Sequence, residues 1–312
     1  MNTKEEALLR LLKQTPRKKL TTGSKNVMVS AAKARFDAQC LAREASRKRV
    51  EPMYEAIRST LSRTPEFSGI VEASKKMKWK PSRSRIATPI RTNWPKKARL
   101  RIGSVHLVDV PPFQTLNWQA ATGGGPPYPD APPTANSNGN MSLLIQTGGD
   151  ANSYNVSCWA AVGQSYSIPD AEGFQNGGIV NFSASPSFVW EAIWYSIAFR
   201  QAAGNIWLGQ VINEFNDQGT LVSTPVSYQT SLFSWNDYNF GDSPTPENGE
   251  STGFNLQCST FVQPGFFYEC WVWIGASANA DGLDSGNSLS NCQMSANVGA
   301  LIFDSFACPP PS

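Results

Sequence analysis

The spacing of apolar residues divides the chain into a helical front part and a β-rich remainder. Residues 4–14 place apolar side chains at helical spacing, and Thr15-Pro16 ends this short amphipathic helix. Residues 29–50 are rich in helix-forming residues, and Pro52 interrupts or restarts a helix that reaches about Leu61. The predicted apolar face of this segment consists of Ala31, Ala32, Phe36, Cys40, Leu41 and Ala45.

After Arg101, short β-rich runs alternate with turn residues. We predict a long loop over 111–140, and strands near 103–110, 141–147, 153–162, 177–184, 187–199, 205–215, 219–225, 228–235, 254–262, 266–274 and 291–305. Such a series is typical of an antiparallel β-sandwich or jelly roll, so the predicted fold class is mainly β, preceded by a basic helical N-terminal arm. The predicted domains are a helical arm with a proline-containing linker, 1–101, and an all-β sandwich domain, 102–312.

The most specific pairing pattern is a hairpin. The runs 254–262 and 266–274 flank the loop Gln263-Pro264-Gly265. Pairing centred on Pro264 places Cys258 opposite Cys270 and makes one face of the hairpin almost wholly apolar, which is the pattern of a side that faces a core.

The other face of this hairpin suggests a ligand platform. It would carry Trp271 and Trp273 together with Gln257 and Glu269. Indole rings stack on the apolar faces of sugars, while amides and carboxylates bind the hydroxyl groups, so a lectin-like, carbohydrate-binding module is one hypothesis. The alternative is that a helix, a loop or a partner covers these aromatic rings.

The distribution of charge along the chain adds a prediction about partners. Of 27 Lys and Arg residues, all but Arg200 lie within residues 1–101, which carry a net charge of +18, whereas residues 102–312 carry −15. An acidic β domain behind a basic arm indicates that the arm contacts nucleic acid or an acidic protein surface. Docking of the arm onto the acidic domain, or a solvated tail, are the alternatives.

The basic residues are densest between Lys75 and Arg101, where Trp79 and Trp94 lie among them. Basic side chains interleaved with indoles suit single-stranded nucleic acid, although these indoles could equally hold the linker on the β domain. The predicted polyanion-binding residues are Arg17, Lys18, Lys19, Lys75, Lys76, Lys78, Lys80, Arg83, Arg85, Lys96 and Lys97.

Catalytic signatures are scarce. The one histidine, His106, has no nucleophile elbow to accompany it, and the glycines at 123–125 do not lie between a strand and a helix as a phosphate loop requires. The cysteines lack the spacing of a zinc site, so we expect no metal and no cofactor. The single enzymatic lead is the pair Glu191 and Glu269, which would suit a retaining glycosidase of jelly-roll type if the two carboxyl groups met.

The order of the parts resembles the coat proteins of small icosahedral RNA viruses, in which a basic arm holds the genome and a jelly roll forms the shell; no residue motif accompanies this likeness. It implies a homo-oligomer and a non-enzymatic role in binding and assembly. No signal peptide follows Met1 and no run is long enough to span a membrane, so we expect the protein inside a cell or within an assembled particle.

Overall fold

The computed structural model confirms a mainly β chain with antiparallel sheets behind N-terminal helices. It describes residues 22–76, 97–101, 103–122, 132–147, 154–168, 174–239, 241, 244–283 and 286–308. The helices in these ranges are α2 (Thr22–Leu61) and α3 (Pro65–Lys75). The helix predicted at 4–14 lies outside the described residues.

Three five-stranded antiparallel sheets follow, which we call the long, facing and end sheets. The long sheet has the order β10 (Leu221–Asp237), β9 (Ala202–Phe215), β13 (Phe267–Ala280), β6 (Tyr154–Tyr166), β3 (Gln114–Thr122). The facing sheet has the order β11 (Thr245–Thr252), β8 (Ser187–Tyr195), β16 (Leu289–Asn297), β5 (Asn140–Ile145), β4 (Thr134–Ala135). The end sheet has the order β1 (Lys97–Arg101), β2 (Ser104–Asp109), β17 (Leu301–Ala307), β7 (Gly178–Ala184), β12 (Leu256–Val262), and β14 (Gly282–Leu283) pairs with β15 (Gly286–Asn287).

One apolar core lies between the long sheet and the other two. Because side chains alternate along a strand, the even-numbered residues of β13 from Cys270 to Ala278 point into this core. The facing sheet packs there through β16 and β5. The end sheet joins the same core where Tyr166 of β6 stacks on Phe303 of β17, with ring centroids 4.9 Å apart.

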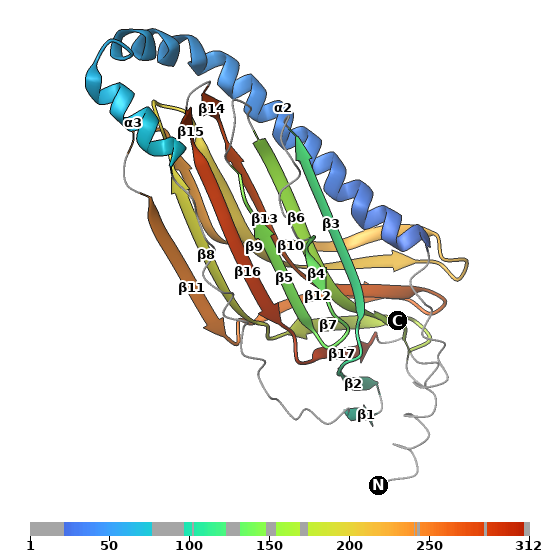
Figure 1. Cartoon of the computed structure of the whole chain (residues 1–312). Helices are drawn as coiled ribbons and strands as arrows, with labels where there is room; N and C mark the ends of the chain where they lie inside the picture. Colours follow the sequence, from blue (N-terminus) through green and yellow to red (C-terminus); the bar gives the residue numbers. More distant parts are fainter. Residues whose placement is uncertain are drawn as a thin grey trace.

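The end sheet continues the facing sheet. Strand β7 leads into β8 through Ser185 and Pro186, and β16 leads into β17 across three residues. Figure 1 shows the end sheet below the other two, with its strands turned away from theirs. The long strands β9 and β13 therefore span both sheets of the opposite layer.

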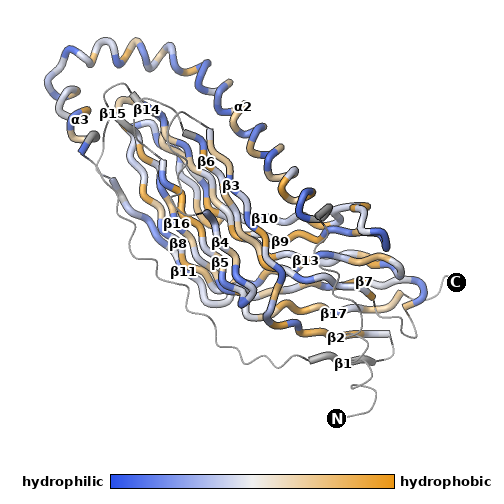
Figure 2. Tube along the Cα trace, turned by 45° about the vertical axis from the view of Figure 1, so that its right-hand side comes forward, coloured by the Kyte–Doolittle hydropathy of each residue, from blue (hydrophilic) through white to orange (hydrophobic). Residues whose placement is uncertain are grey.

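Helix α2 covers the other face of the long sheet (Figure 1). Met28, Ala32 and Phe36 recur every fourth residue, which places them on one side of a helix, and they face this sheet. Leu41, predicted on the apolar face, is instead 67% exposed. The helix runs through Pro52 without a break, and Figure 2 shows hydrophilic residues along much of its length.

The predicted hairpin between 254–262 and 266–274 is wrong. The turn forms, with Gly265 at a φ of +82°, but the two strands diverge into different sheets. Cys258 on β12 lies opposite Phe182, whereas Cys270 on β13 lies opposite Gln164 and Ile212. Each strand satisfies its hydrogen bonds with a partner distant in sequence, because the core needs apolar residues in both layers.

Some strands lie where the sequence predicts none. Strand β3 lies within the predicted loop 111–140, and β1 lies within the predicted linker. Strand β11 has the sequence TPENGEST, which is poor in strand-forming residues, but it is an edge strand that pairs only with β8. The two strands predicted at 219–225 and 228–235 form the single strand β10, which has irregular register.

Candidate functional site

The outer face of the long sheet is an aromatic surface. Trp271 and Trp273 of β13 point away from the core, and so do Trp159 of β6 and Trp207 of β9. Trp118 of β3 lies opposite Trp159 in the strand pairing. These five residues, which we call the tryptophan face, come from four adjacent strands.

Glycines make room for three of these indoles. Trp271 lies opposite Gly163, Trp273 opposite Gly209, and Trp207 opposite Gly275. A Cβ atom on Gly163 or Gly209 would come within 2.6 Å of the facing indole ring. The missing side chains therefore let large rings lie flat on the neighbouring strand, which no other residue would permit.

Helix α2 packs over the tryptophan face. Phe36 is 5% exposed and meets Trp118 edge to face, with ring centroids 6.1 Å apart. Polar contacts flank this packing: Arg35 Nη1 donates to Gln229 Oε1 at 2.9 Å, and Arg43 Nη1 donates to Asn155 Oδ1 at 2.8 Å.

Further along α2, a second aromatic contact holds the helix. The ring of Tyr54 stacks against both Phe199 and Tyr238, with centroids 5.7 Å apart in each case. Arg200, the sole basic residue of the predicted β domain, forms an ion pair with Glu51 of the helix at 2.9 Å. The helix is thus fixed on the β domain by rings at two places along its length.

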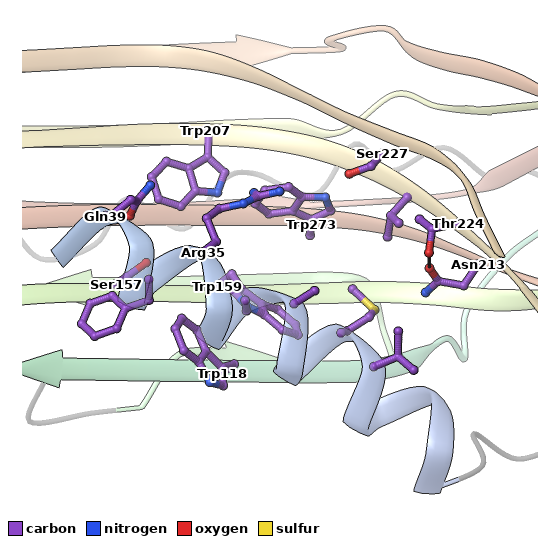
Figure 3. A pocket seen from close by; sticks show the side chains of 16 residues that line it. Arg35, Gln39, Trp118, Ser157, Trp159, Trp207, Asn213, Thr224, Ser227 and Trp273 are labelled. Carbon is purple, nitrogen blue, oxygen red and sulfur yellow. Dashed lines mark hydrogen bonds between the residues drawn. The ribbon is translucent and has the colours of Figure 1, made fainter. Parts of the chain in front are cut away.

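A cavity of about 140 Å³ remains between helix and sheet (Figure 3). Its helical wall comes from residues 27–39, and its opposite wall includes four indoles of the tryptophan face. Polar groups from β6, β9 and β10 complete it: Ser157, Asn213, Thr224 and Ser227. The cavity is mainly apolar with a few polar groups, which is the usual character of a small-molecule site.

The structure does not bring the four predicted platform residues together. Trp271 is fully buried beneath α2, Glu269 is 1% exposed, and Trp273 is half-buried and lines the cavity. Gln257 lies exposed on β12 in the end sheet. The alternative of a covering helix accounts for the buried rings, since α2 occupies this face.

Glu191 and Glu269 do not form a carboxylate pair either. Both alternate with core residues, so they point away from the core on opposite layers, Glu191 from the facing sheet and Glu269 from the long sheet. Gln293 Nε2 donates to Glu191 Oε2 at 2.7 Å. Since packed sheets are ~10 Å apart, the two outward carboxyl groups are too distant for the ~5 Å pair of a retaining glycosidase.

Most of the predicted polyanion-binding residues lie outside the described residues; these are Arg17, Lys18, Lys19, Lys78, Lys80, Arg83, Arg85 and Lys96. Lys76 follows α3 directly and is exposed. Lys75 ends α3, and Lys97 begins β1 opposite Val108.

The histidine and the buried cysteines have surroundings that do not indicate catalysis. His106 on β2 lies opposite Asp304 on β17, and its Nδ1 is 2.5 Å from Asp304 Oδ1. Burial raises the pKa of the thiols of Cys158, Cys270 and Cys292, which keeps them protonated and unreactive at neutral pH. Across the described ranges, no group of three His, Cys, Asp or Glu side chains could hold a metal ion. None of the described helices is long and apolar enough to cross a membrane.

Comparisons with known proteins show no family. No family model and no curated protein match the chain. Among solved structures, a CocE/NonD family hydrolase from Staphylococcus aureus has 10% identity and a TM-score of 0.17 over 54% of this chain, which covers only 34% of the hydrolase. A carbohydrate-binding module in complex with β-1,4-galactotriose has 9% identity and a TM-score of 0.13, over 52% of this chain and 86% of the module.

A capsid protein gives a likeness of the same weakness. The subunit of T=1 particles derived from infectious bursal virus has 14% identity and a TM-score of 0.12, over 59% of this chain and 44% of that one. Likenesses this weak carry no argument about function.

Proposed function

We propose that this chain is a non-enzymatic structural and binding protein, in which the basic arm contacts nucleic acid and the β domain mediates assembly. The observation that carries the proposal is that the basic residues of α2 that contact the β domain, Arg35, Arg43 and Arg58, bind neutral oxygen atoms there, so their charge is not neutralised by an acidic residue in these contacts. Helix α2 docks through rings and neutral polar groups, while Lys25, Lys48 and Arg49 on it are exposed. In the ion pair Arg200–Glu51 it is the helix that supplies the acid.

The charge balance supports an external polyanion. Residues 1–101 carry +18, and docking of α2 as described uses little of this charge. A phosphate backbone binds such an arm by releasing its condensed counterions. The acidic β domain would repel the same backbone, so the arm would have to hold nucleic acid at a distance from that domain.

The strand order supports a jelly roll as the assembly domain. Eight strands, numbered 1 to 8 in chain order, are β5, β6, β8, β9, β10, β11, β13 and β16. The facing sheet then has the order 1-8-3-6 and the long sheet 2-7-4-5. This nested order is that of two Greek keys in a jelly roll, an architecture found in viral capsids and also in lectins.

An exposed apolar cluster supports contact with a second copy of the chain. Ile179 on β7 lies opposite Phe261 of β12 on one side and Phe306 of β17 on the other. All three side chains are 46–50% exposed. Adjacent exposed apolar residues on a sheet mark a surface for protein contact, in keeping with the expected homo-oligomer.

Salt-dependent binding tests the polyanion proposal. We expect the full chain to bind single-stranded RNA with an affinity that falls steeply with salt, and glutamine at Lys75, Lys76, Lys78 and Lys80 to reduce the log–log slope by up to about 3, since each lost phosphate contact removes ~0.7. A control variant replaces Glu247 and Glu250 of β11, both exposed, with glutamine; it removes no phosphate contact and should keep the wild-type salt slope. An affinity indifferent to salt, or an unchanged slope in the lysine variant, would refute the proposal.

A further inference from the structure

The cavity beneath α2 is lined by residues with buried donors that have no hydrogen-bond partner among the described residues. Trp207 is 6% exposed, and its Nε1–H finds no acceptor among the described residues. Asn213 is 1% exposed; its Oδ1 accepts from Thr224 Oγ1 at 3.0 Å, while its Nδ2 has no partner there. Leaving a buried N–H unpaired is unfavourable, so an acceptor supplied by a ligand would be favoured in this cavity.

The positions of these groups suit a ligand inside the cavity. In Figure 3 the indole nitrogen of Trp207 is on the side of the ring toward Trp273 and Arg35, and Asn213 lies toward the other end, beside Thr224. Both residues line the cavity. The two unpartnered groups are donors, so the ligand must bring acceptors.

The side chains that line the cavity favour a flat aromatic ring as its ligand. Four indoles, Phe36 and Met28 supply aromatic and polarisable surface on both sides of the cavity. Its volume of about 140 Å³ is close to that of an engineered apolar cavity, ~150 Å³, that holds one benzene molecule. One six-membered aromatic ring therefore fits this volume.

Arg35 supplies a positive charge that favours an anionic ligand. Its guanidinium lines the cavity and donates one N–H to Gln229 Oε1, and a guanidinium has five such donors. An anionic acceptor would form charge-assisted hydrogen bonds with it, which are stronger than neutral ones. Arg35 is also exposed to solvent, so a neutral ring would leave only the indole N–H unpaired, but it would gain no charge-assisted hydrogen bond from Arg35.

We propose that the cavity between α2 and the tryptophan face binds a single-ring aromatic carboxylate, whose ring lies among the indoles and whose carboxylate accepts from Trp207 Nε1–H and the Arg35 guanidinium. Helix α2 forms one wall of this site, so binding requires the docked helix. By linkage, the ligand stabilises that docked arrangement. This site is independent of the proposed nucleic-acid contacts.

Fluorine NMR of 4-fluorobenzoate tests the proposal on the full chain. We expect saturable broadening and a shift of the fluorine signal on addition of protein. Trp207→Phe replaces the indole by a smaller aromatic ring that lacks the N–H, and Arg35→Gln removes the charge. Each should weaken binding about tenfold or more, the usual loss for a hydrogen bond to a charged group. Lys33→Gln removes a charge from an exposed position of the same helix and should leave the affinity unchanged.

Three outcomes would overturn the proposal: no saturable binding of 4-fluorobenzoate, equal binding of neutral 4-fluorobenzyl alcohol, or wild-type affinity in both the Trp207 and Arg35 variants. Competition by a neutral monosaccharide but not by benzoate would also overturn it in favour of a sugar site. Far-UV circular dichroism of each variant verifies that it is folded. Because the carboxylate contacts proposed here are those of Trp207 and Arg35, the variant with glutamine at Lys75, Lys76, Lys78 and Lys80 separates failure of this proposal from failure of nucleic-acid binding.

Discussion

The pairing of Trp207 with Gly275 allows a sharp test of how the tryptophan face is built. An alanine methyl at position 275 would lie 2.6 Å from Cε2 of the Trp207 indole and closer still to Nε1. Gly275 is not among the glycines with positive φ, so alanine meets no backbone obstacle there. The substitution therefore tests side-chain overlap alone.

Two opposing effects determine how much Gly275→Ala changes the free energy of unfolding. Overpacking of a buried site costs about 1–3 kcal/mol, whereas replacing glycine by alanine in a strand gains about 0.5–1 kcal/mol in backbone entropy. We expect Gly275→Ala to lower the free energy of unfolding by about 1–2 kcal/mol, with the overlap outweighing the entropy gain. In a Trp207→Ala background the overlap is gone, so the same change should stabilise by about 0.5–1 kcal/mol.

Urea unfolding followed by far-UV circular dichroism measures all four members of this cycle, and unchanged m-values would support a direct comparison of midpoints. Gly69→Ala is the matched control, because a Cβ at this position of α3 meets nothing within 4 Å and should stabilise by about 1 kcal/mol. The reasoning fails if Gly275→Ala is stabilising in the wild type, or if its effect is the same with and without the indole.

Two further predictions concern the helix and the core. Phe36→Ala should weaken docking of α2 by about 3 kcal/mol, because it truncates a buried phenylalanine. Amide hydrogen exchange should then become faster across residues 22–61 while the sheets stay protected, whereas Leu41→Ala, at an exposed position, should leave exchange unchanged. Equal protection of the helix in both variants would contradict the docking. Burial raises the pKa of Tyr166 from 10.0 to about 12. Between these values the unfolded chain loses a proton that the folded chain keeps, so stability should fall by about 2–3 kcal/mol across the window. Tyr268 and the buried cysteines also have raised pKa values, so alkaline urea titrations of Tyr166→Phe should show a fall that is smaller by the contribution of Tyr166. An identical pH profile in the variant would refute the assignment.

Local features of this protein could be read from its sequence. The helix around 29–50 and strands such as β5 and β7 follow from the spacing of apolar residues, which depends only on neighbours along the chain. The turn at Gly265 also forms as its residues indicate. The separation of charge between the two parts is a property of composition and needs no structure at all.

The candidate site was only partly visible. The sequence pattern points to two of its tryptophans, Trp271 and Trp273, but not to Trp118, Trp159 or Trp207. A signal for them exists in the matching of tryptophan with glycine across strands, as at Gly163 and Gly209. It can be used only when the strand partners are known, and the sequence contains many glycines in turns as well.

Tertiary structure decided which strands pair and what covers each face. The runs 254–262 and 266–274 match as a hairpin locally, but pairing within it would have left β7 and β9 without the partners that close the core. The same choice put Glu269 and Glu191 on opposite layers and α2 over the tryptophans. Turn residues and the spacing of apolar side chains determine structure over only a few residues. The free energy gained by burying apolar surface is summed over the whole chain, so it can override a pairing that is favourable locally.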